Sequence, residues 1–333
     1  MADTPLSESA AIAVIREMLS APAPALEVGV GDDAAVFHFA GGSIILTVDS
    51  IYEGIHFTLD TCGLADIGWK AMAASVSDIA AMGGQPLCAL MSVAFGAPPT
   101  EDEVRALLGG ALEMSGSCNC SIIGGDICRS SSGLGVSVTV AGTPHAYGPV
   151  LRSGAREGDI IGVTGTLGDS AGGLYVLKSG HPDLRAKFPA LVDAHLRPES
   201  RIPAGEILAS CGASAMEDVS DGLAADLVHI CQESDVGCEI YSEAIPLSGE
   251  LRALANEARC DPLQWALAGG EDYELVFTAP EERFSKALSS LAEREAPATR
   301  IGVVAHASKG TRLIAPDGRA ESLEGLGYDH FLK

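Results

Sequence analysis

Strand-like and helix-like segments alternate along the first half of the chain, and this alternation limits the folds open to it. Residues 42–50 (GSIILTVDS) form an apolar, β-branched run that ends in a carboxylate, as expected of a buried strand. Apolar residues then recur at helical spacing from Leu64 to Met82, and Gly83-Gly84 predicts the end of that helix. Similar patterns predict strands at 87–95 and 134–143 and helices at 8–19 and 101–115.

The pattern restarts in the second half, after HAYGPV (145–150) interrupts the periodicity. Residues 158–177 predict a strand, a glycine turn and a helix, and helices are also expected near 201–210 and 280–293, with a last strand near 299–305. A chain of 333 residues is long enough for two domains of ordinary size. We therefore expect two α/β or α+β domains, residues 1–146 and 147–333.

The formal net charge is −24, from 45 acidic and 21 basic side chains. Such a surface repels nucleic acid and anionic membranes, so neither is an expected partner. Phosphate ligands remain possible partners if divalent cations lie between the two sets of negative charge. Simple solubility, or adaptation to salt, is the alternative explanation of the charge.

The nine cysteines include no C-x-x-C pair, and an odd number does not suit a disulfide framework. Cys118-x-Cys120 with Cys128 nearby could indicate a metal site, but no histidine lies at suitable spacing, so reduced thiols are expected. The N-terminus lacks the pattern of a signal peptide, and no apolar run reaches the roughly 18 residues of a membrane span. These features predict a cytoplasmic protein.

Acidic residues recur beside glycines, mostly at the ends of apolar runs. The set comprises Asp32 and Asp33 after Gly29-Val30-Gly31, Asp49 at a strand end, Asp126 after Gly124-Gly125, Asp218, Ser220 and Asp221 before Gly222, and Glu271 and Asp272 after Gly269-Gly270. Each one alone fits an ordinary turn. Together they favour a binding site, because loops at strand ends commonly gather ligand groups in α/β proteins.

Asp78 lies inside the apolar helix KAMAASVSDIAAMGG, on the same i, i+4, i+8 row as Lys70 and Ala74. A solvated helix face is one interpretation, but few other positions of that helix are polar. A carboxylate in an apolar setting needs a cation or a buried donor. We therefore include Asp78 among the candidate site residues.

Carboxylates in this number favour a hard divalent cation. Mg²⁺ usually bridges a few protein carboxylates to substrate phosphates, which suits ligands scattered over several loops. No EF-hand pattern or Gly-Lys dipeptide of a Walker A motif occurs, and Gly165-x-x-Gly168 lacks the full dinucleotide-binding fingerprint. Lysines are scarce, so arginines such as Arg152 are candidates to offset the remaining phosphate charge.

Eight segments in order resemble the thiamine-monophosphate kinases, a family of the aminoimidazole-ribonucleotide-synthetase-like ATP-binding superfamily. They are GVGDDAAV, TVDSIYEGIHF, KAMAASVSDIAAMGG, GGDICRS, LRSGA, DVSDGL, GGEDYEL and GYDHF. Each segment alone is weak, but the set runs from Gly29 to Phe331.

The resemblance implies a two-domain PurM-like fold, with an N-terminal α/β domain forming the dimer sheet or barrel and an α+β C-terminal domain. It also implies a homodimer that binds ATP, several Mg²⁺ ions and thiamine monophosphate. The implied reaction transfers the γ-phosphoryl group directly to thiamine monophosphate, giving thiamine diphosphate and ADP. No catalytic general base is expected, because the attacking phosphate oxygen is already ionised.

The resemblance also assigns roles to residues. The implied metal ligands are Asp33, Thr47, Val48, Asp49, Asp78, Asp126, Asp218 and Asp221, with Val48 able to offer only its backbone carbonyl. Gly125, Asp126, Arg152 and Ser220 match ATP-contacting positions, and His56, Glu271 and Tyr328 match positions that contact the thiamine phosphate. Asp32 is expected to orient the loop or to bind metal through water.

Two other functions remain open from the sequence. One is another ATP-dependent enzyme of the same superfamily, although no cysteine precedes Cys62 to serve as the reactive residue of a selenophosphate synthetase. The other is a non-catalytic protein that binds divalent metal. Turnover of ATP with thiamine monophosphate would separate these alternatives from the kinase.

Overall fold

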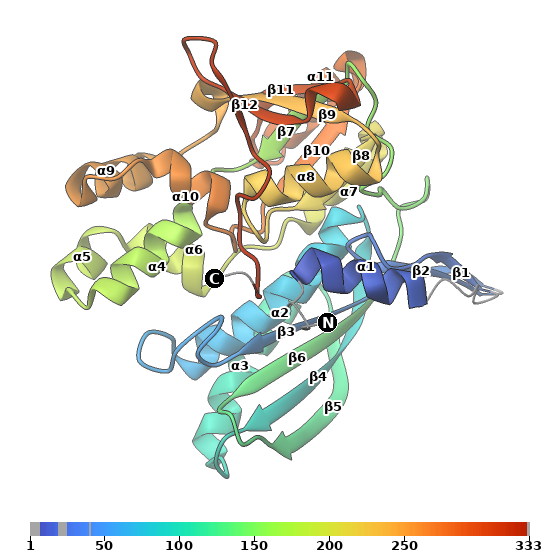
Figure 1. The fold of residues 1–333 in the computed structure, drawn as a ribbon. Helices are drawn as coiled ribbons and strands as arrows, with labels where there is room; N and C mark the ends of the chain where they lie inside the picture. The colour runs from blue at the N-terminus through green and yellow to red at the C-terminus, as the bar shows by residue number, and fades with distance from the viewer. Residues whose placement is uncertain (1–6, 19–24, 40, 332–333) are drawn as a thin grey trace, which may run out of the picture.

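The computed structural model describes residues 7–18, 25–39 and 41–331, which form two sheets with helices packed on them (Figure 1). Among the described helices, none has both the length and the apolar character needed to cross a membrane. The nine cysteines are free thiols. The mixed α/β character expected of both halves is confirmed.

The N-terminal sheet has six strands in the order β1-β2-β3-β6-β4-β5. Its strands are β1 (Leu26–Val28), β2 (Ala35–Phe39), β3 (Gly42–Tyr52), β4 (Gln85–Phe95), β5 (Ser121–Arg129) and β6 (Gly135–Thr143), and its helices are α1 (Glu8–Met18), α2 (Leu64–Ala81) and α3 (Glu101–Ser117). The strands and helices predicted in this half are therefore confirmed to within two residues, except that Leu19 lies outside the described residues. The strands β1, β2 and β5 were not predicted.

The C-terminal sheet has seven strands in the order β13-β12-β9-β11-β7-β10-β8. They are β7 (Ile160–Thr164), β8 (Ala215–Asp218), β9 (Gly237–Tyr241), β10 (Leu275–Ala279), β11 (Ala298–Ala305), β12 (Thr311–Ile314) and β13 (Ala320–Ser322). The helices are α4 (Asp169–Ser179), α5 (Pro182–Lys187), α6 (Pro189–Leu196), α7 (Ile202–Cys211), α8 (Leu223–Glu233), α9 (Gly249–Ala258), α10 (Pro262–Ala268) and α11 (Glu281–Ala292). The boundary near residue 146 stays a prediction.

Helix α2 lies between the two sheets and joins them. It packs on β3 and β6 of the first sheet, and it also contacts β8 and α7 of the second half (Figure 1). Most of its side chains are buried, including the long side chain of Lys70, which is 2% exposed. Asp78 is half-buried on this helix and accepts a hydrogen bond from the Thr47 hydroxyl of β3, which decides against an ordinary solvated helix face.

Two glycines allow α2 and α3 to approach closely. A Cβ atom on Gly68 would lie 1.9 Å from the Leu107 carbonyl oxygen, and a Cβ atom on Gly110 would lie 1.7 Å from the Ala65 carbonyl oxygen. Both separations are far shorter than a van der Waals contact. The adjacent Gly109 has no neighbouring atom within 4 Å of the same position.

The face of the first sheet opposite α2 and α3 carries exposed apolar side chains. Strand β3 alternates between the two faces, so that Thr47 is buried while Val48 is 62% exposed. Leu46 on the same strand, Leu90 on β4 and Ile123 on β5 are exposed as well. A patch of this kind, named here the outer sheet face, is typical of a protein-protein interface.

Gly109 and Gly110 give a matched test of the close helix packing. Gly109→Ala should stabilise the protein by about 0.5–1 kcal/mol, because glycine is a poor helix former. Gly110→Ala should destabilise it by about 1–3 kcal/mol through overpacking. Urea unfolding followed by circular dichroism measures both, and equal effects of the two substitutions would contradict the packing argument.

Candidate active site

A cleft of about 670 Å³ lies beside α2, between the end of β3 and the loops that follow β8 and α10. Many of the residues singled out from the sequence line it. They are Asp49, His56, Asp78, Asp218, Ser220, Asp221, Glu271 and Tyr328. The fold therefore brings these eight positions to one cavity, although they are distant in the sequence.

Four aspartates meet at one end of this cleft. Carboxylate oxygens of Asp33, Asp78 and Asp218 all lie within 4.8 Å of one another. Asp49 adjoins Asp78 and Asp33. We call Asp33, Asp49, Asp78 and Asp218 the aspartate cluster.

Each member of the aspartate cluster is positioned by a different element. Asp33 follows Gly31, whose φ of 121° permits the turn, and Asp218 is the last residue of β8. On β3, the alternation of side chains turns Thr47 and Asp49 toward α2, and the Thr47 hydroxyl donates a hydrogen bond to Asp78. The same alternation turns the side chain of Val48 away from the cluster.

Burial and repulsion by neighbouring carboxylates raise the pKa values of Asp49, Asp78 and Asp218. Burial is the larger cause for Asp218, whose pKa rises to about 8, and the charge of Asp33 adds to it. The pKa of Asp78 is raised by burial and by the charges of Asp49 and Asp218, and the pKa of Asp49 is raised mainly by burial. The carboxylate forms therefore require a cation close by.

The donor set of the aspartate cluster suits Mg²⁺. It consists of carboxylate oxygens with a threonine hydroxyl beside them, and hard oxygen ligands select Mg²⁺, Ca²⁺ or Mn²⁺. The Asp33 Oδ2 atom is buried and accepts no hydrogen bond from the described residues. An unpartnered buried carboxylate oxygen that faces two other carboxylates fits a site for a divalent cation.

Asp32 and Asp33 have different surroundings. The carboxylate of Asp32 accepts hydrogen bonds from the backbone N–H groups of Asp33 (3.1 Å) and Arg152 (3.2 Å). Burial and the charge of Asp33 raise the pKa of Asp32 to about 7. Asp33 instead pairs with the Arg152 guanidinium at 2.7 Å, which also lies 3.0 Å from Glu217. Asp32 thus orders the loop, and Arg152 offsets part of the charge of the cluster.

Aromatic and imidazole rings form another part of the cleft. The ring centroids of His56 and His330 are 5.1 Å apart, and those of Tyr328 and His330 are 4.9 Å apart in an edge-on arrangement. Burial lowers the pKa of His56, which favours its neutral form. The Glu8 carboxylate, at the start of α1, accepts a hydrogen bond from the His330 N–H at 3.1 Å. Residues from the two extremes of the chain thus meet at the cleft.

Glu271 is held by a buried lysine that the sequence did not single out as a site residue. Lys70 Nζ lies 2.8 Å from Glu271 Oε2 and 3.5 Å from His195 Nε2. Burial pushes the pKa of Glu271 upward, but the charge and hydrogen bond of Lys70 together with the nearby histidines outweigh it, so the pKa is lowered. Lys70 lies on the same helical row as Asp78, and this shared row was the sequence signal that could have identified it as a site residue. His195 and His330 were also missed, and His195 lay in no motif.

Gly125 and Asp126 lie apart from the cleft within the single chain. They belong to the edge strand β5, which is separated from β3 by β6 and β4. At about 4.8 Å per strand, this places them some 14 Å across the sheet from Asp49. Both are exposed.

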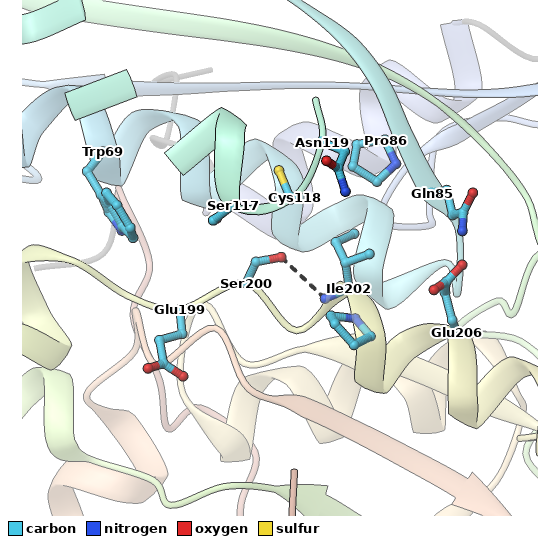
Figure 2. Close-up of a pocket in the computed structure, with 11 residues that line it drawn as sticks. Trp69, Gln85, Pro86, Ser117, Cys118, Asn119, Glu199, Ser200, Ile202 and Glu206 are labelled. Atoms are coloured by element: carbon cyan, nitrogen blue, oxygen red, sulfur yellow. Dashed lines mark hydrogen bonds between the residues drawn. The ribbon is translucent and has the colours of Figure 1, made fainter. Parts of the chain in front are cut away.

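A second hollow of about 530 Å³ lies near the start of β4 and the end of α3, and faces α7 (Figure 2). Trp69, Gln85 and Cys118 line one side, and Ser200, Ile202 and Glu206 line the other (Figure 2). None of the residues proposed from the sequence lines it. The chemistry expected from the sequence therefore belongs to the first cleft.

Two family models cover most of the chain. Residues 31–143 match the model of the AIR synthase related protein N-terminal domain, and residues 156–314 match that of the C-terminal domain. Together they confirm the expected two-domain fold.

Individual relatives carry a more specific name. The thiamine-monophosphate kinase of Bacillus subtilis is 36% identical over 309 residues, which are 92% of this chain and 94% of that protein. The thiamine-monophosphate kinase of Escherichia coli K12 is also 36% identical, over 92% of each chain. A solved structure described as AaThiL complexed with AMPPCP and TMP superposes with a TM-score of 0.86 at 34% identity, covering 99% of this chain and 100% of that one.

The raised pKa values predict an unusual dependence of stability on pH. An unfolded aspartate titrates near pKa 3.8, so the folded state binds its protons more tightly than the unfolded chain does. Stability therefore falls as pH rises toward the folded-state pKa values of about 7 for Asp32 and about 8 for Asp218. In EDTA, the Tm should fall as the pH rises from about 6.5 to 8.5, measured by differential scanning calorimetry.

Two controls accompany this measurement. Asp218→Asn should reduce the slope, because it removes one of the titrating groups. Saturating Mg²⁺ should reduce it too, since a bound cation holds the carboxylates ionised at every pH in this range. A Tm that is constant or rises between these pH values in EDTA would refute the assignment.

Proposed function

The chain belongs to the thiamine-monophosphate kinase family, and from this membership and the contents of the cleft we propose that it transfers the γ-phosphoryl group of ATP to thiamine monophosphate. The products are thiamine diphosphate and ADP. The observation that supports this most directly is the combination, in one cavity, of the aspartate cluster with the ring-lined part around His56 and Tyr328. The aspartate cluster can hold a phosphate chain through bound cations. The ring-lined part suits the heteroaromatic rings of the second substrate.

The proposed metal ligands are the aspartate cluster together with Thr47, Asp221 and the backbone carbonyl of Val48. Mg²⁺ held by these residues would neutralise phosphate charge and help to align the reacting groups. The attacking group is a phosphate oxygen that is ionised at neutral pH, so no protein group must remove a proton from it. This agrees with a cleft that is rich in carboxylates.

We assign the remaining residues to ATP or to thiamine monophosphate from their matched positions in the family and from their contacts in the cleft. Arg152 and Ser220 would contact ATP, and Arg152 is held in position by ion pairs with Asp33 and Glu217. His56, Glu271 and Tyr328 would contact thiamine monophosphate. Lys70 would hold the Glu271 carboxylate in place, since the two form an ion pair at 2.8 Å. The cytoplasm remains the predicted location.

We propose a homodimer formed through the outer sheet face. The apolar side chains of Leu46, Val48, Leu90 and Ile123 are exposed there, and burial against a second copy would stabilise them. The proposed roles of Gly125 and Asp126 in ATP and metal binding require the same assembly, because β5 lies across the sheet from the cleft of its own chain. In this arrangement, β5 of one copy lies beside the cleft of the other.

A non-catalytic metal-binding protein is the main alternative, and turnover distinguishes it from the kinase. The purified protein with ATP, Mg²⁺ and thiamine monophosphate should produce thiamine diphosphate, detected as its fluorescent thiochrome derivative. Asp78→Asn should lower the rate by at least about 100-fold, because it removes a metal ligand at the centre of the cluster. The fold should persist, and absence of product with the wild-type protein would refute the kinase assignment.

Asp126 permits a complementation test of the dimer. Asp126→Asn should be inactive alone, as should Asp78→Asn. If Asp126 acts in the partner's cleft, a mixed dimer of the two variants has one intact site, and random mixing should restore about a quarter of the wild-type rate. The mixture is unfolded and refolded together so that subunits exchange. No recovery from well-folded mixed dimers would show that Asp126 does not act across the interface.

A further inference from the structure

A second group of metal-ligating side chains lies behind β8, on the side opposite the aspartate cluster. It consists of Glu217 on β8 and of Asp226 and His229 on α8. Neighbouring residues of a strand point to opposite faces, so Glu217 faces away from the Asp218 side of β8. Asp226 and His229 are three residues apart on α8, which places them on one face of the helix, and α8 packs against β8.

Three of the four carboxylate oxygens of this group lack hydrogen-bond partners among the described residues. Both oxygens of Asp226 and Oε2 of Glu217 are buried and accept no hydrogen bond within the described part of the chain. Asp226 as a whole is 0% exposed. A fully buried carboxylate without a donor carries a large desolvation cost unless a cation or water is present.

The nearby protein cations do not supply the missing partner. Arg152 lies 3.0 Å from Glu217 Oε1 and 2.7 Å from Asp33 Oδ1, but no ion pair joins it to Asp226 among the described residues. His229 Nδ1 lies 2.9 Å from the same Oε1 atom of Glu217. One oxygen of Glu217 is thus occupied, while its other oxygen and both oxygens of Asp226 remain available.

The spacing suits coordination. One ligand atom each from Glu217, Asp226 and His229 lies within 4.8 Å of the other two. Neighbouring ligand atoms of a tetrahedral Zn²⁺ site lie about 3.4 Å apart, so side-chain rotations of roughly an ångström would close the site. His229 is 33% exposed and lies at the solvent side of the group, which provides a route of entry.

We propose that Glu217, Asp226 and His229 bind a divalent transition metal such as Zn²⁺, at a site separate from the aspartate cluster. An imidazole nitrogen with two carboxylates favours Zn²⁺ over Mg²⁺, whereas the all-oxygen aspartate cluster favours Mg²⁺. The bound ion joins β8 to α8 and fixes Glu217, and through Glu217 it positions Arg152. The proposal does not depend on the kinase activity, which is measured separately with Mg²⁺ alone.

The test is a calorimetric titration of Zn²⁺ into chelator-treated protein, with millimolar Mg²⁺ present to occupy the aspartate cluster. The wild type should bind one equivalent. Asp226→Asn and His229→Gln should each weaken that binding by more than about 100-fold, because each removes a direct ligand. Asp78→Asn should bind Zn²⁺ as the wild type does, since it alters only the other site.

His38→Gln is the matched control. His38 Nε2 also lies 2.9 Å from a carboxylate, that of Glu27, but the pair is exposed and no second carboxylate of the described residues completes a ligand group with it. The His38→Gln variant should therefore still bind one equivalent of Zn²⁺, as the wild type does. Circular dichroism checks that each variant is folded, and His229→Gln is the more tolerant one because the histidine is partly exposed.

Crystals soaked with Zn²⁺ provide a second measurement. An anomalous peak between Glu217, Asp226 and His229 is expected at the zinc edge. Wild-type protein without a Zn²⁺ equivalent, or a His229→Gln variant that binds Zn²⁺ like the wild type, would overturn the proposal. Either result would leave a buried water or proton as the partner of Asp226.

Discussion

The repulsion among Asp33, Asp49, Asp78 and Asp218 is the constraint on which the cleft depends. Three of these carboxylates lie within 4.8 Å of one another in a buried setting, where like charges strongly oppose ionisation. Packing of the surrounding elements must hold them together against that repulsion. The cleft is therefore least stable when its aspartates are ionised and no cation is bound, which is the state that binds cations. Such a loss of stability for the sake of function is common in proteins.

Helix α2 provides the support that this arrangement needs. It packs against strands of both sheets and against α3, where Gly68 and Gly110 let the backbones nearly touch. Asp78 and Lys70 lie on this one rigid element, so the acidic part of the cleft and the Glu271 ion pair are fixed relative to each other. A site built on a well-packed helix is held more precisely than one built on loops alone.

The sequence predicted the main strands and helices, because apolar periodicity reflects burial directly. It also identified the carboxylates, since glycine beside an acidic residue at a strand end is a local signal. It did not identify His195, which reaches Lys70 only through the packing of α6, and it could not show that Arg152 contacts Glu217 as well as Asp33. Nor could it show that Asp126 lies across the sheet, because strand order depends on contacts between distant segments.

The contact between Glu8 and His330 also bears on how the protein folds. A hydrogen bond between residues 322 positions apart closes almost the whole chain into a loop, and such contacts form late because the chain entropy opposes them. His330 belongs to the same wall of the cleft as Tyr328 and His56. This wall of the cleft is therefore complete only when the segment around Tyr328 and His330 has docked against His56 and α1.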